Sequence, residues 1–501
     1  MNVLLINPGA SNIYSKIEAN LPPLGIAYLA AVAREGGHKV KIIDLNIDIR
    51  ALEKTNLNDY DIFGITTDTP RYNEALRIAR EISITGKPIV MGGYHVTFLD
   101  EEVLSTGYVD VVVRGEGEEI FLNILNALEN KTGLKDILGI SYIDEGMFVR
   151  NNDALPPKNL DEMPFPARDL LPISKYKTSL NGVPSANLIT SRGCPYNCYF
   201  CASSKFGGIK WRARSAKNIV DEMEILHNEF GYRAFEFLDD NFTLSKKRIF
   251  EFADELEKRG LTDIIWWCFA RVDTIAKNEP MVKRMAEVGA YRVFLGLESV
   301  NENVLDNYGK KIDNDEQVKA INLLRKYGIG IHGSFIIGDI NETEEMIMNT
   351  VNWAKKMNPQ LAQFSLLTPF PGTQLYYDMK KENKLLHNDW RLFDALHPTV
   401  KLNNISPAEA QKLVISSYRK FYISLHRFFH LPKPYFREGM PKGKFKLFDS
   451  ILAPINLFIQ FRNEMRRSSK VIRKADRAKQ SIIKPERQEY FMEDYETTKI
   501  K

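Results

Sequence analysis

Three of the four cysteines of this 501-residue chain, Cys194, Cys198 and Cys201, lie within eight residues. A C-x3-C-x2-C spacing can place three thiolates on three irons of a [4Fe–4S] cube and leave the fourth iron open. Structural zinc usually takes four Cys or His ligands in two pairs, and no histidine lies within twenty residues of this loop. The remaining cysteine, Cys268, lies in an apolar run and is expected to be a small core residue. The spacing therefore predicts a cluster whose open iron can be chelated by an amine and a carboxylate.

Charged side chains follow the predicted strands in the second half of the chain. Asp239 and Asp240 come directly after one such strand, Arg271 follows the next, and Glu298 follows a third. In barrel enzymes the carboxyl ends of the strands carry the chemistry. Carboxylates in such places also often cap the following helix. We therefore treat these four residues as candidate catalytic or binding residues, and the capping role stays open.

Hydrophobic periodicity divides the chain into regions. Residues 1–135 alternate strand and helix, which predicts an α/β, doubly wound (Rossmann-like) sheet. Residues 186–400 hold six more strand–helix units, which predict a partial (β/α)6 barrel, with a complete eight-unit barrel as the alternative. The less periodic residues 136–185 are expected to be a linker. Residues 401–501 are expected to form a helical, basic C-terminal domain that packs against the open barrel.

The predicted N-terminal sheet carries glycines and polar residues just after three of its strands. Ligands of such sheets bind outside the carboxyl ends of the strands, and glycine lets the backbone approach a ligand closely. A glycine pair after a strand is also often only a turn. The candidate cofactor-binding residues here are Thr66, Thr67, Asp68, Gly92, Gly93, His95, Gly115 and Glu116. For His95, a plain loop histidine and a polar contact to the cofactor are both open.

Composition narrows the class of protein. No apolar run reaches the roughly 18–20 residues of a membrane span, and the first residues form a predicted strand rather than a signal peptide. Few cysteines, clustered as ligands, predict a reducing, cytoplasmic location. The net charge of +4 comes from residues 431–501, where 17 Lys/Arg face 9 Asp/Glu. That tail is either a solvated basic segment or a docking surface for an acidic protein or a membrane surface; no nucleic-acid motif is present.

The cysteine loop resembles the signature of the radical S-adenosylmethionine (SAM) superfamily, with an aromatic residue before Cys201. Three further blocks resemble the cobalamin-dependent branch of that superfamily, methyltransferase type: residues 22–25 (PPLG), Gly92-Gly93-x-His95, and residues 115–118 (GEGE). The resemblance covers residues 1–400. It implies three cofactors, namely a [4Fe–4S] cluster on Cys194, Cys198 and Cys201, SAM, and cobalamin as methylcobalamin.

The resemblance also implies roles for the candidate residues. Phe200 is expected near the adenine of SAM, and Glu298 near its ribose hydroxyls. Asp239 and Asp240 resemble an Asp-Asp pair near the SAM amino group or the substrate, and Arg271 is expected to hold the SAM carboxylate or a substrate group. The D-x-H-x-x-G motif that supplies a cobalt-ligating histidine in methionine-synthase-type domains is absent. The segment 66–72 is therefore expected to cover the lower face of the cobalamin.

The activity implied by this resemblance is radical methyl transfer. An electron donor reduces the cluster, one SAM gives a 5′-deoxyadenosyl radical, and a second SAM remethylates cobalamin. We expect C-methylation of an unactivated sp3 carbon in a protein or peptide, with a glutamine of methyl-coenzyme M reductase as one candidate. A cobalamin-dependent methylase or cyclase of a lipid or small molecule is the first alternative. A non-catalytic iron–sulfur or cobalamin sensor is the second.

Overall fold

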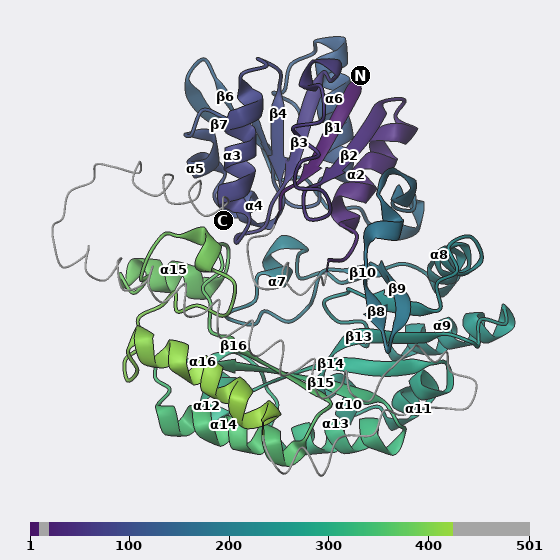
Figure 1. The fold of residues 1–501 in the computed structure, drawn as a ribbon, viewed down its shortest axis with the longest axis vertical. Helices are drawn as coiled ribbons and strands as arrows, with labels where there is room; N and C mark the ends of the chain where they lie inside the picture. The colour runs from purple at the N-terminus through teal and green to yellow at the C-terminus, as the bar shows by residue number, and fades with distance from the viewer. Residues whose placement is uncertain (10–19, 424–501) are drawn as a thin grey trace.

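The computed structural model describes residues 1–9 and 20–423, and Figure 1 shows their arrangement. Two seven-stranded sheets organise this part of the chain. The N-terminal sheet lies at the top of Figure 1 and the second sheet at the bottom, with the chain between them around α7 (Ser203–Phe206). The expected basic tail and the helices predicted over 449–461 and 464–479 lie outside the described residues. Within the described ranges, no helix is long and apolar enough to cross a membrane.

The N-terminal sheet is doubly wound, as predicted. Its strand order is β2-β1-β3-β4-β5-β6-β7, and the first five strands run parallel. These strands are β1 (Asn2–Asn7), β2 (Lys39–Asp44), β3 (Ile62–Thr66), β4 (Ile89–Gly92) and β5 (Val111–Val113). Their side chains alternate between two apolar layers. One layer packs under α2 (Leu24–Glu35) and α6 (Glu118–Asn130), and the other under α3 (Tyr72–Ser83) and α5 (Asp100–Leu104).

Part of the predicted linker belongs to this sheet. β6 (Ile140–Asp144) pairs antiparallel with β5, and β7 (Met147–Arg150) continues the sheet as a hairpin. The hairpin turn uses Glu145 and Gly146, both with positive φ, at 48° and 81°. Two left-handed residues in a tight turn match the twist of the flanking strands. The strands are four and five residues long, too short for their alternation to be recognised in the sequence.

The second sheet is an open half-barrel, which confirms the partial (β/α)6 architecture. Its order is β16-β15-β14-β13-β12-β9-β8, so β16 and β8 are edges that do not meet. The six parallel strands are β9 (Val183–Leu188), β12 (Ala234–Phe237), β13 (Ile265–Arg271), β14 (Ala290–Glu298), β15 (Gly330–Ile337) and β16 (Leu361–Leu366). Their outer face packs under helices α8 (Ala216–Asn228), α9 (Lys246–Lys258), α11 (Glu279–Glu287), α13 (Asn314–Lys326) and α14 (Glu344–Met357).

Helix α16 (Pro407–Tyr422) covers the free edge of β16. The backbone N–H of Phe364 donates to the Tyr418 hydroxyl (3.2 Å), and that of Ala362 donates to the Tyr422 hydroxyl (2.9 Å). Two tyrosines therefore take hydrogen bonds that a further strand would otherwise accept. An edge protected in this way is no longer a template for pairing with another chain. This is the packing role expected for the beginning of the C-terminal region.

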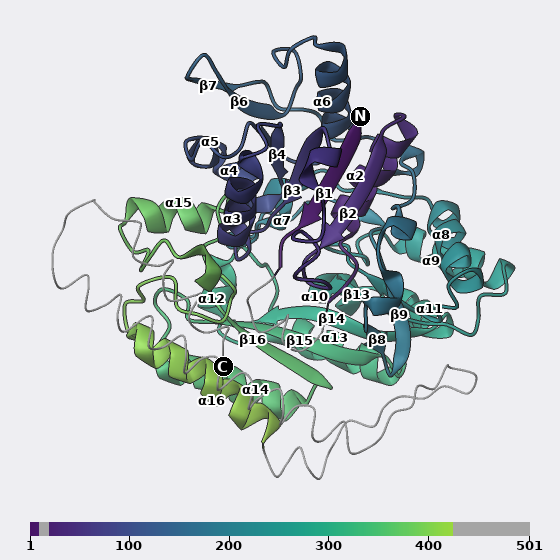
Figure 2. The same cartoon turned by 45° about the horizontal axis from the view of Figure 1, so that its top comes forward.

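The segment after β16 returns to the N-terminal sheet. α15 (Gln374–Lys381) lies beside α3 and α4 (Tyr94–Phe98), as Figure 2 shows, and the short helix η5 (Trp390–Leu392) contacts α3. Tyr376, Trp390 and Phe393 belong to the same buried cluster as the α3 side of the N-terminal sheet. Gly372, with φ +88°, passes so close to Phe98 that a Cβ would lie 2.5 Å from its ring. The segment that follows the second sheet therefore packs into the core of the N-terminal sheet.

Candidate functional site

A cavity of about 460 Å³ opens at the carboxyl ends of β12 to β16. The inner face of the half-barrel forms its floor, and the cysteine loop forms one wall. The structure brings eight of the predicted site residues together in its lining: Cys194, Cys198, Phe200, Cys201, Asp239, Asp240, Arg271 and Glu298. These residues come from three separate strand ends and one loop, so the parallel order of the strands is what assembles them.

The cysteine loop is held by close backbone packing. Gly193, with φ +80°, lies so near the next loop that a Cβ would come within 2.6 Å of the Lys210 carbonyl oxygen and 2.9 Å of those of Gly207 and Gly208. The loop is further fixed by the N–H of Cys194, which donates to the Gly208 carbonyl (3.1 Å). Only glycine fits at position 193. The start of the cysteine loop is therefore fixed by backbone-to-backbone packing.

The three thiols line one wall of the cavity. Within the described residues, no three metal-ligating side chains converge on one point. In a [4Fe–4S] cube each thiolate binds a different iron, so its ligands need not converge. Burial raises the pKa of Cys194 to about 11 and also raises that of Cys201. Because coordination to a cationic metal centre deprotonates a thiol outright, such thiols need the iron to become ligands.

Asp239 and Asp240 have different surroundings although they are neighbours. The Asp239 carboxylate is buried and accepts from the Thr190 N–H (2.6 Å), from the hydroxyls of Thr190 and Ser191, and from Arg248 (3.2 Å). These bonds tie the strand end before the cysteine loop to α9. The Asp240 side chain is open to the cavity, and burial beside the Asp239 charge raises its pKa. Asp239 is placed to support the loop, and Asp240 is placed to meet a ligand.

Arg271 lies against the cysteine loop. Its guanidinium is 3.8 Å from the Cys198 sulfur, stacks on the Tyr196 ring at 3.5 Å, and pairs with Asp273 at 3.0 Å. One face of this cation is therefore taken by the loop itself. The arrangement puts a fixed positive charge beside the predicted cluster, where it favours anionic sulfur.

Sequence reasoning missed Lys310, which forms a buried ion pair with Glu298 inside the cavity. The side chains are each 7% exposed, and Glu298 adopts an unusual φ of +60° at the end of β14. Lys310 lies in a loop beside a second lysine, and no spacing or periodicity distinguishes it. Only the packing of that loop shows that a cation accompanies Glu298.

The predicted cofactor residues of the N-terminal sheet gather at its carboxyl edge. Thr67 donates its N–H to Gly92 (2.9 Å), and Gly93 has φ +115° with no room for a Cβ beside the Thr67 carbonyl. The side chain of Asp68 pairs with Arg71 at 2.6 Å, and the N–H of Gly115 donates to the Thr97 hydroxyl (3.0 Å). Thr66 ends β3 at the same edge. Gly93 is therefore required by its close packing against the Thr67 backbone, and the Thr67 and Asp68 side chains lie at the same edge.

His95 is a core residue in this structure. It is fully buried, stacks on Tyr72 with ring centroids 4.1 Å apart, and meets the edge of Trp390 at 4.8 Å. Its Nδ1 lies 3.3 Å from the Thr69 hydroxyl. Burial lowers the pKa of His95 to about 3, so the imidazole is neutral at physiological pH. The contacts favour the plain structural role among the two roles left open by the sequence.

Glu116 faces the half-barrel instead of the open edge of its own sheet. Its carboxylate, 5% exposed, accepts from Arg192 (2.9 Å) and from both terminal nitrogens of Arg212, while Arg192 also pairs with Glu118 (2.6 Å). Arg192 and Arg212 flank the cysteine loop on the two strands of a short hairpin. The sequence predicted a cofactor contact for Glu116. In the structure its carboxylate is occupied by this network, which joins the two sheets.

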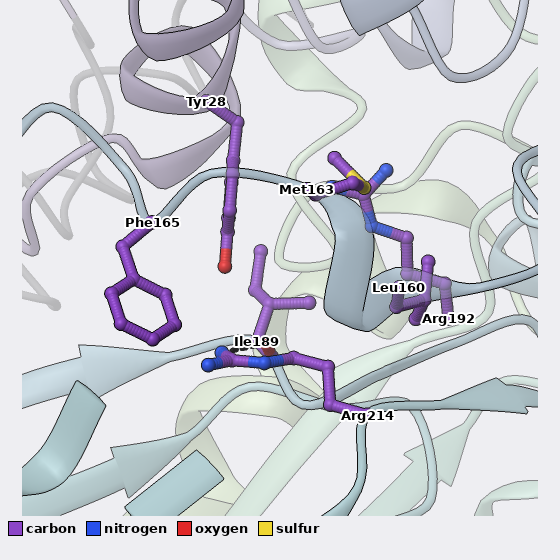
Figure 3. Close-up of a pocket in the computed structure, with 7 residues that line it drawn as sticks. All are labelled: Tyr28, Leu160, Met163, Phe165, Ile189, Arg192 and Arg214. Carbon is purple, nitrogen blue, oxygen red and sulfur yellow. Dashed lines mark hydrogen bonds between the residues drawn. The ribbon is translucent and has the colours of Figure 1, made fainter. Parts of the chain in front are cut away.

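A small cavity of about 10 Å³ lies next to this network, between the N-terminal sheet and the half-barrel (Figure 3). Its lining includes Tyr28, Phe165, Arg192 and Arg214. Arg192 lies over the Tyr28 ring at 5.4 Å, and Arg214 over the Phe165 ring at 5.2 Å. A space of this size holds about one water molecule. Tyr94 of α4 and Phe206 of α7 form another contact between the N-terminal sheet and the half-barrel, and their ring centroids are 4.0 Å apart. The interface is packed, so the position of one sheet relative to the other is defined.

Comparisons with known proteins agree with this geometry. A family model described as the radical SAM superfamily matches residues 188–354, and one described as the B12 binding domain matches residues 12–125. An uncharacterised methyltransferase of Pyrococcus horikoshii, PH0819, is 40% identical over 432 residues, which cover 84% of this chain and 93% of that protein. An anaerobic magnesium-protoporphyrin IX monomethyl ester cyclase of Cereibacter sphaeroides is 30% identical and covers 86% of this chain and 72% of its own length.

Solved structures share the fold. The radical SAM methyltransferase TsrM of Kitasatospora setae, with cobalamin and a [4Fe–4S] cluster bound, superposes with a TM-score of 0.67 at 17% identity, covering 96% of this chain and all of that one. The cobalamin-dependent radical SAM enzyme OxsB superposes with a TM-score of 0.70, also at 17% identity, covering 94% and 80%. The chain therefore belongs to the cobalamin-dependent radical SAM methyltransferases, whose cofactors are a [4Fe–4S] cluster, SAM and cobalamin.

Proposed function

We propose that this enzyme methylates an unactivated sp3 carbon by a radical route. The observation that carries the proposal is the single cavity in which the three cysteines meet Asp240, Arg271 and the Glu298–Lys310 pair, on the side of the half-barrel that faces the N-terminal sheet. When bound, the cofactors supply the electron, the 5′-deoxyadenosyl radical and the methyl group. The residues of the chain bind, orient and exclude water.

In this proposal, different residues that line the cavity bind the cluster and the parts of SAM. Cys194, Cys198 and Cys201 hold the cluster, and Phe200 packs against the adenine. Glu298 accepts hydrogen bonds from the ribose hydroxyls, and Lys310 beside it offers a cation to the carboxylate. Arg271 is held by Tyr196 and Asp273, and Lys310 is held by Glu298, so both cations are candidates for the carboxylate. Asp240 is left to meet the SAM ammonium group or the substrate.

We further assign cobalamin to the carboxyl edge of the N-terminal sheet, within residues 1–135. Thr66, Thr67, Asp68, Gly92, Gly93 and Gly115 are its proposed contacts. Asp239 and Glu116 are positioning residues here, because their carboxylates hold the cysteine loop and the joint between the sheets. The segment 66–72 as a cover of the lower face, the need for an electron donor and the cytoplasmic location all stay predictions.

The substrate is the open part of the proposal. Relatives that align over about 70–80% of this chain act, by their names, on a bacteriochlorophyllide, a hopanoid and a cytidylyl phosphonate. These favour a small or lipid-like molecule over a protein. A peptide substrate, including a glutamine of methyl-coenzyme M reductase, stays a prediction. The likeness to the magnesium-protoporphyrin ester cyclases makes radical cyclisation the second candidate activity.

The test is anaerobic. The full chain is reconstituted with iron, sulfide and methylcobalamin, given SAM and a strong reductant, and assayed for 5′-deoxyadenosine and S-adenosylhomocysteine together. Methylation predicts both products and cobalamin retained on the protein; cyclisation predicts 5′-deoxyadenosine without S-adenosylhomocysteine. Cys198→Ala is the negative control for both. If the protein retains no cobalamin, the methylation proposal fails.

A further inference from the structure

Arg292 is a cation on the inner face of the half-barrel without a carboxylate partner. Side chains alternate between the two faces of a strand, and Phe294 and Gly296 of β14 line the cavity. Arg292, two residues before Phe294, therefore points to the same side. Its side chain is partly exposed, its Nε is buried without a hydrogen bond among the described residues, and no salt bridge engages it in that part of the chain.

Among the described residues, Tyr291 is a hydrogen-bond partner of Arg292, and no carboxylate forms a salt bridge with it. Its guanidinium lies 5.2 Å from the centroid of the Tyr291 ring. The charged and titratable groups that face it are Tyr291, Tyr422, Glu236 and His332. The Glu236 carboxylate already accepts from the Ser185 hydroxyl and from the Trp267 indole N–H (2.8 Å). Burial accordingly lowers the pKa of Arg292.

The other cations of this face are paired, which sets Arg292 apart. Arg271 pairs with Asp273, and Lys310 pairs with Glu298. A desolvated cation is costly unless a counter-charge accompanies it. Among the described residues Glu236 is the carboxylate that acts on Arg292, and it forms no salt bridge with it, so a ligand anion could bind the guanidinium directly.

The strand register places Arg292 at the far end of an aromatic floor. Trp267 is the β13 neighbour of Arg292, and Phe269 is the neighbour of Phe294. His332 is the β15 neighbour of Phe294 and meets its ring edge-on at 4.6 Å. No hydrogen bond among the described residues engages the His332 ring. At about 3.3 Å per residue, the backbone of Arg292 lies about 13 Å from that of Gly296, which lines the SAM end of the cavity.

From this arrangement we propose that Arg292, with His332 beside it, binds an anionic oxygen group of the substrate, a carboxylate or a phosphate. The apolar part of the substrate lies over Phe269 and Phe294, and its reacting carbon reaches the end of the cavity near Gly296. The inference rests on the proposed function, since it assumes that the substrate occupies this cavity. It narrows the substrate to an amphiphilic molecule with an anionic group at one end and the reacting carbon toward the other.

The test uses matched probes on the reconstituted full-length enzyme. Octyl phosphate, octanoate and uncharged octan-1-ol are titrated by isothermal calorimetry, and the two anions separate phosphate from carboxylate. At least one anion should bind about tenfold or more tightly than octanol, in line with a charge-assisted hydrogen bond. Arg292→Gln should abolish this preference and leave octanol binding unchanged, and Arg292→Lys should keep part of it. Arg284→Gln, an arginine paired with Glu257 on α9, is the matched control and should bind as the wild type does.

Equal binding of anions and octanol to the wild type would overturn the inference, as would an anion preference that survives in Arg292→Gln. If Arg292→Gln does not fold, judged by circular dichroism and iron content, then Arg292→Lys and the salt dependence of the wild-type preference decide instead. If the preference for anions over octanol is the same in Arg292→Lys as in the wild type and does not change with salt concentration, the inference is contradicted. The proposed function is tested independently of this inference, because its readouts are S-adenosylhomocysteine and 5′-deoxyadenosine and need no anion probe.

Discussion

Glu116 joins the two halves of the enzyme, and replacing it with glutamine should weaken that joint by about 3–5 kcal/mol. The magnitude follows from burial. The Glu116 side chain is 5% exposed, and it is the carboxylate partner of Arg212, whose side chain is 3% exposed. Glutamine leaves Arg212 with the carbonyl oxygens of Pro157 and Gly207, each at 3.0 Å. With only neutral acceptors, most of the free-energy cost of burying the Arg212 charge is no longer offset, so the folded state is destabilised.

The assay is urea unfolding of the full chain followed by circular dichroism, for Glu116→Gln and for Glu119→Gln. Glu119 is exposed on α6, three residues after Glu116, so its change should stay within about 0.5 kcal/mol. A double-mutant cycle of Glu116→Gln with Arg212→Met, which keeps most of the apolar stem, should give a coupling energy of about 2 kcal/mol or more. If Glu116→Gln behaves like Glu119→Gln, the reasoning is refuted. Loss of bound cobalamin at unchanged stability would instead make Glu116 a direct cofactor ligand.

Three further outcomes are expected. Gly193→Ala should lose most of its iron on reconstitution, whereas Gly208→Ala, at a similar φ of +81° but with open space around its Cβ position, should keep it; equal iron content would contradict the packing argument. The pKa of His95 in the folded protein is about 3, below its ordinary value of about 6.5. The unfolded chain therefore binds a proton at this histidine before the folded protein does, so the free energy of unfolding falls as the pH drops from about 6.5 toward about 3. His95→Phe should remove about 2–3 kcal/mol of the stability change between pH 6 and pH 4, measured by urea unfolding, and an unaltered profile would disprove it. Lys310→Met should weaken SAM binding about 10–100-fold in equilibrium dialysis at unchanged iron content; unchanged binding would exclude Lys310 as a SAM contact.

Several features of the site could be predicted because they depend on residues near one another in the sequence. The C-x3-C-x2-C spacing indicated the cluster, and the ends of predicted strands indicated Asp240, Arg271 and Glu298. Parallel strands bring their carboxyl ends to one edge, so strand ends far apart in the chain could be expected to meet. The cavity lining confirms that these residues come together, while their individual roles stay predictions.

Other features depended on contacts between distant segments. Lys310 reaches Glu298 only because the loop after α12 (Glu302–Asn307) folds over the strand end. Tyr376 and Trp390, expected to belong to the barrel, pack into the core of the N-terminal sheet. The hairpin of β6 and β7 was hidden in a segment expected to be a linker. A single sequence carries no signal for such pairings, because neither residue type nor local period states which partner a side chain meets.

The linear order of residues was sufficient for the cofactor chemistry, the alternation of strands and helices and the open form of the barrel, since ligand spacing and periodicity are local properties. Only the tertiary structure shows which carboxylates hold other segments in place and which face the cavity. Asp239 and Glu116 resemble functional carboxylates in the sequence, but burial places each against donors from other segments that use up its hydrogen-bonding capacity. Among the described residues, Asp240 and Arg292 form no salt bridge, and Asp240 faces the cavity. Which charges are neutralised within the protein is settled by long-range packing, because desolvation and ion pairing depend on the whole surroundings of a group.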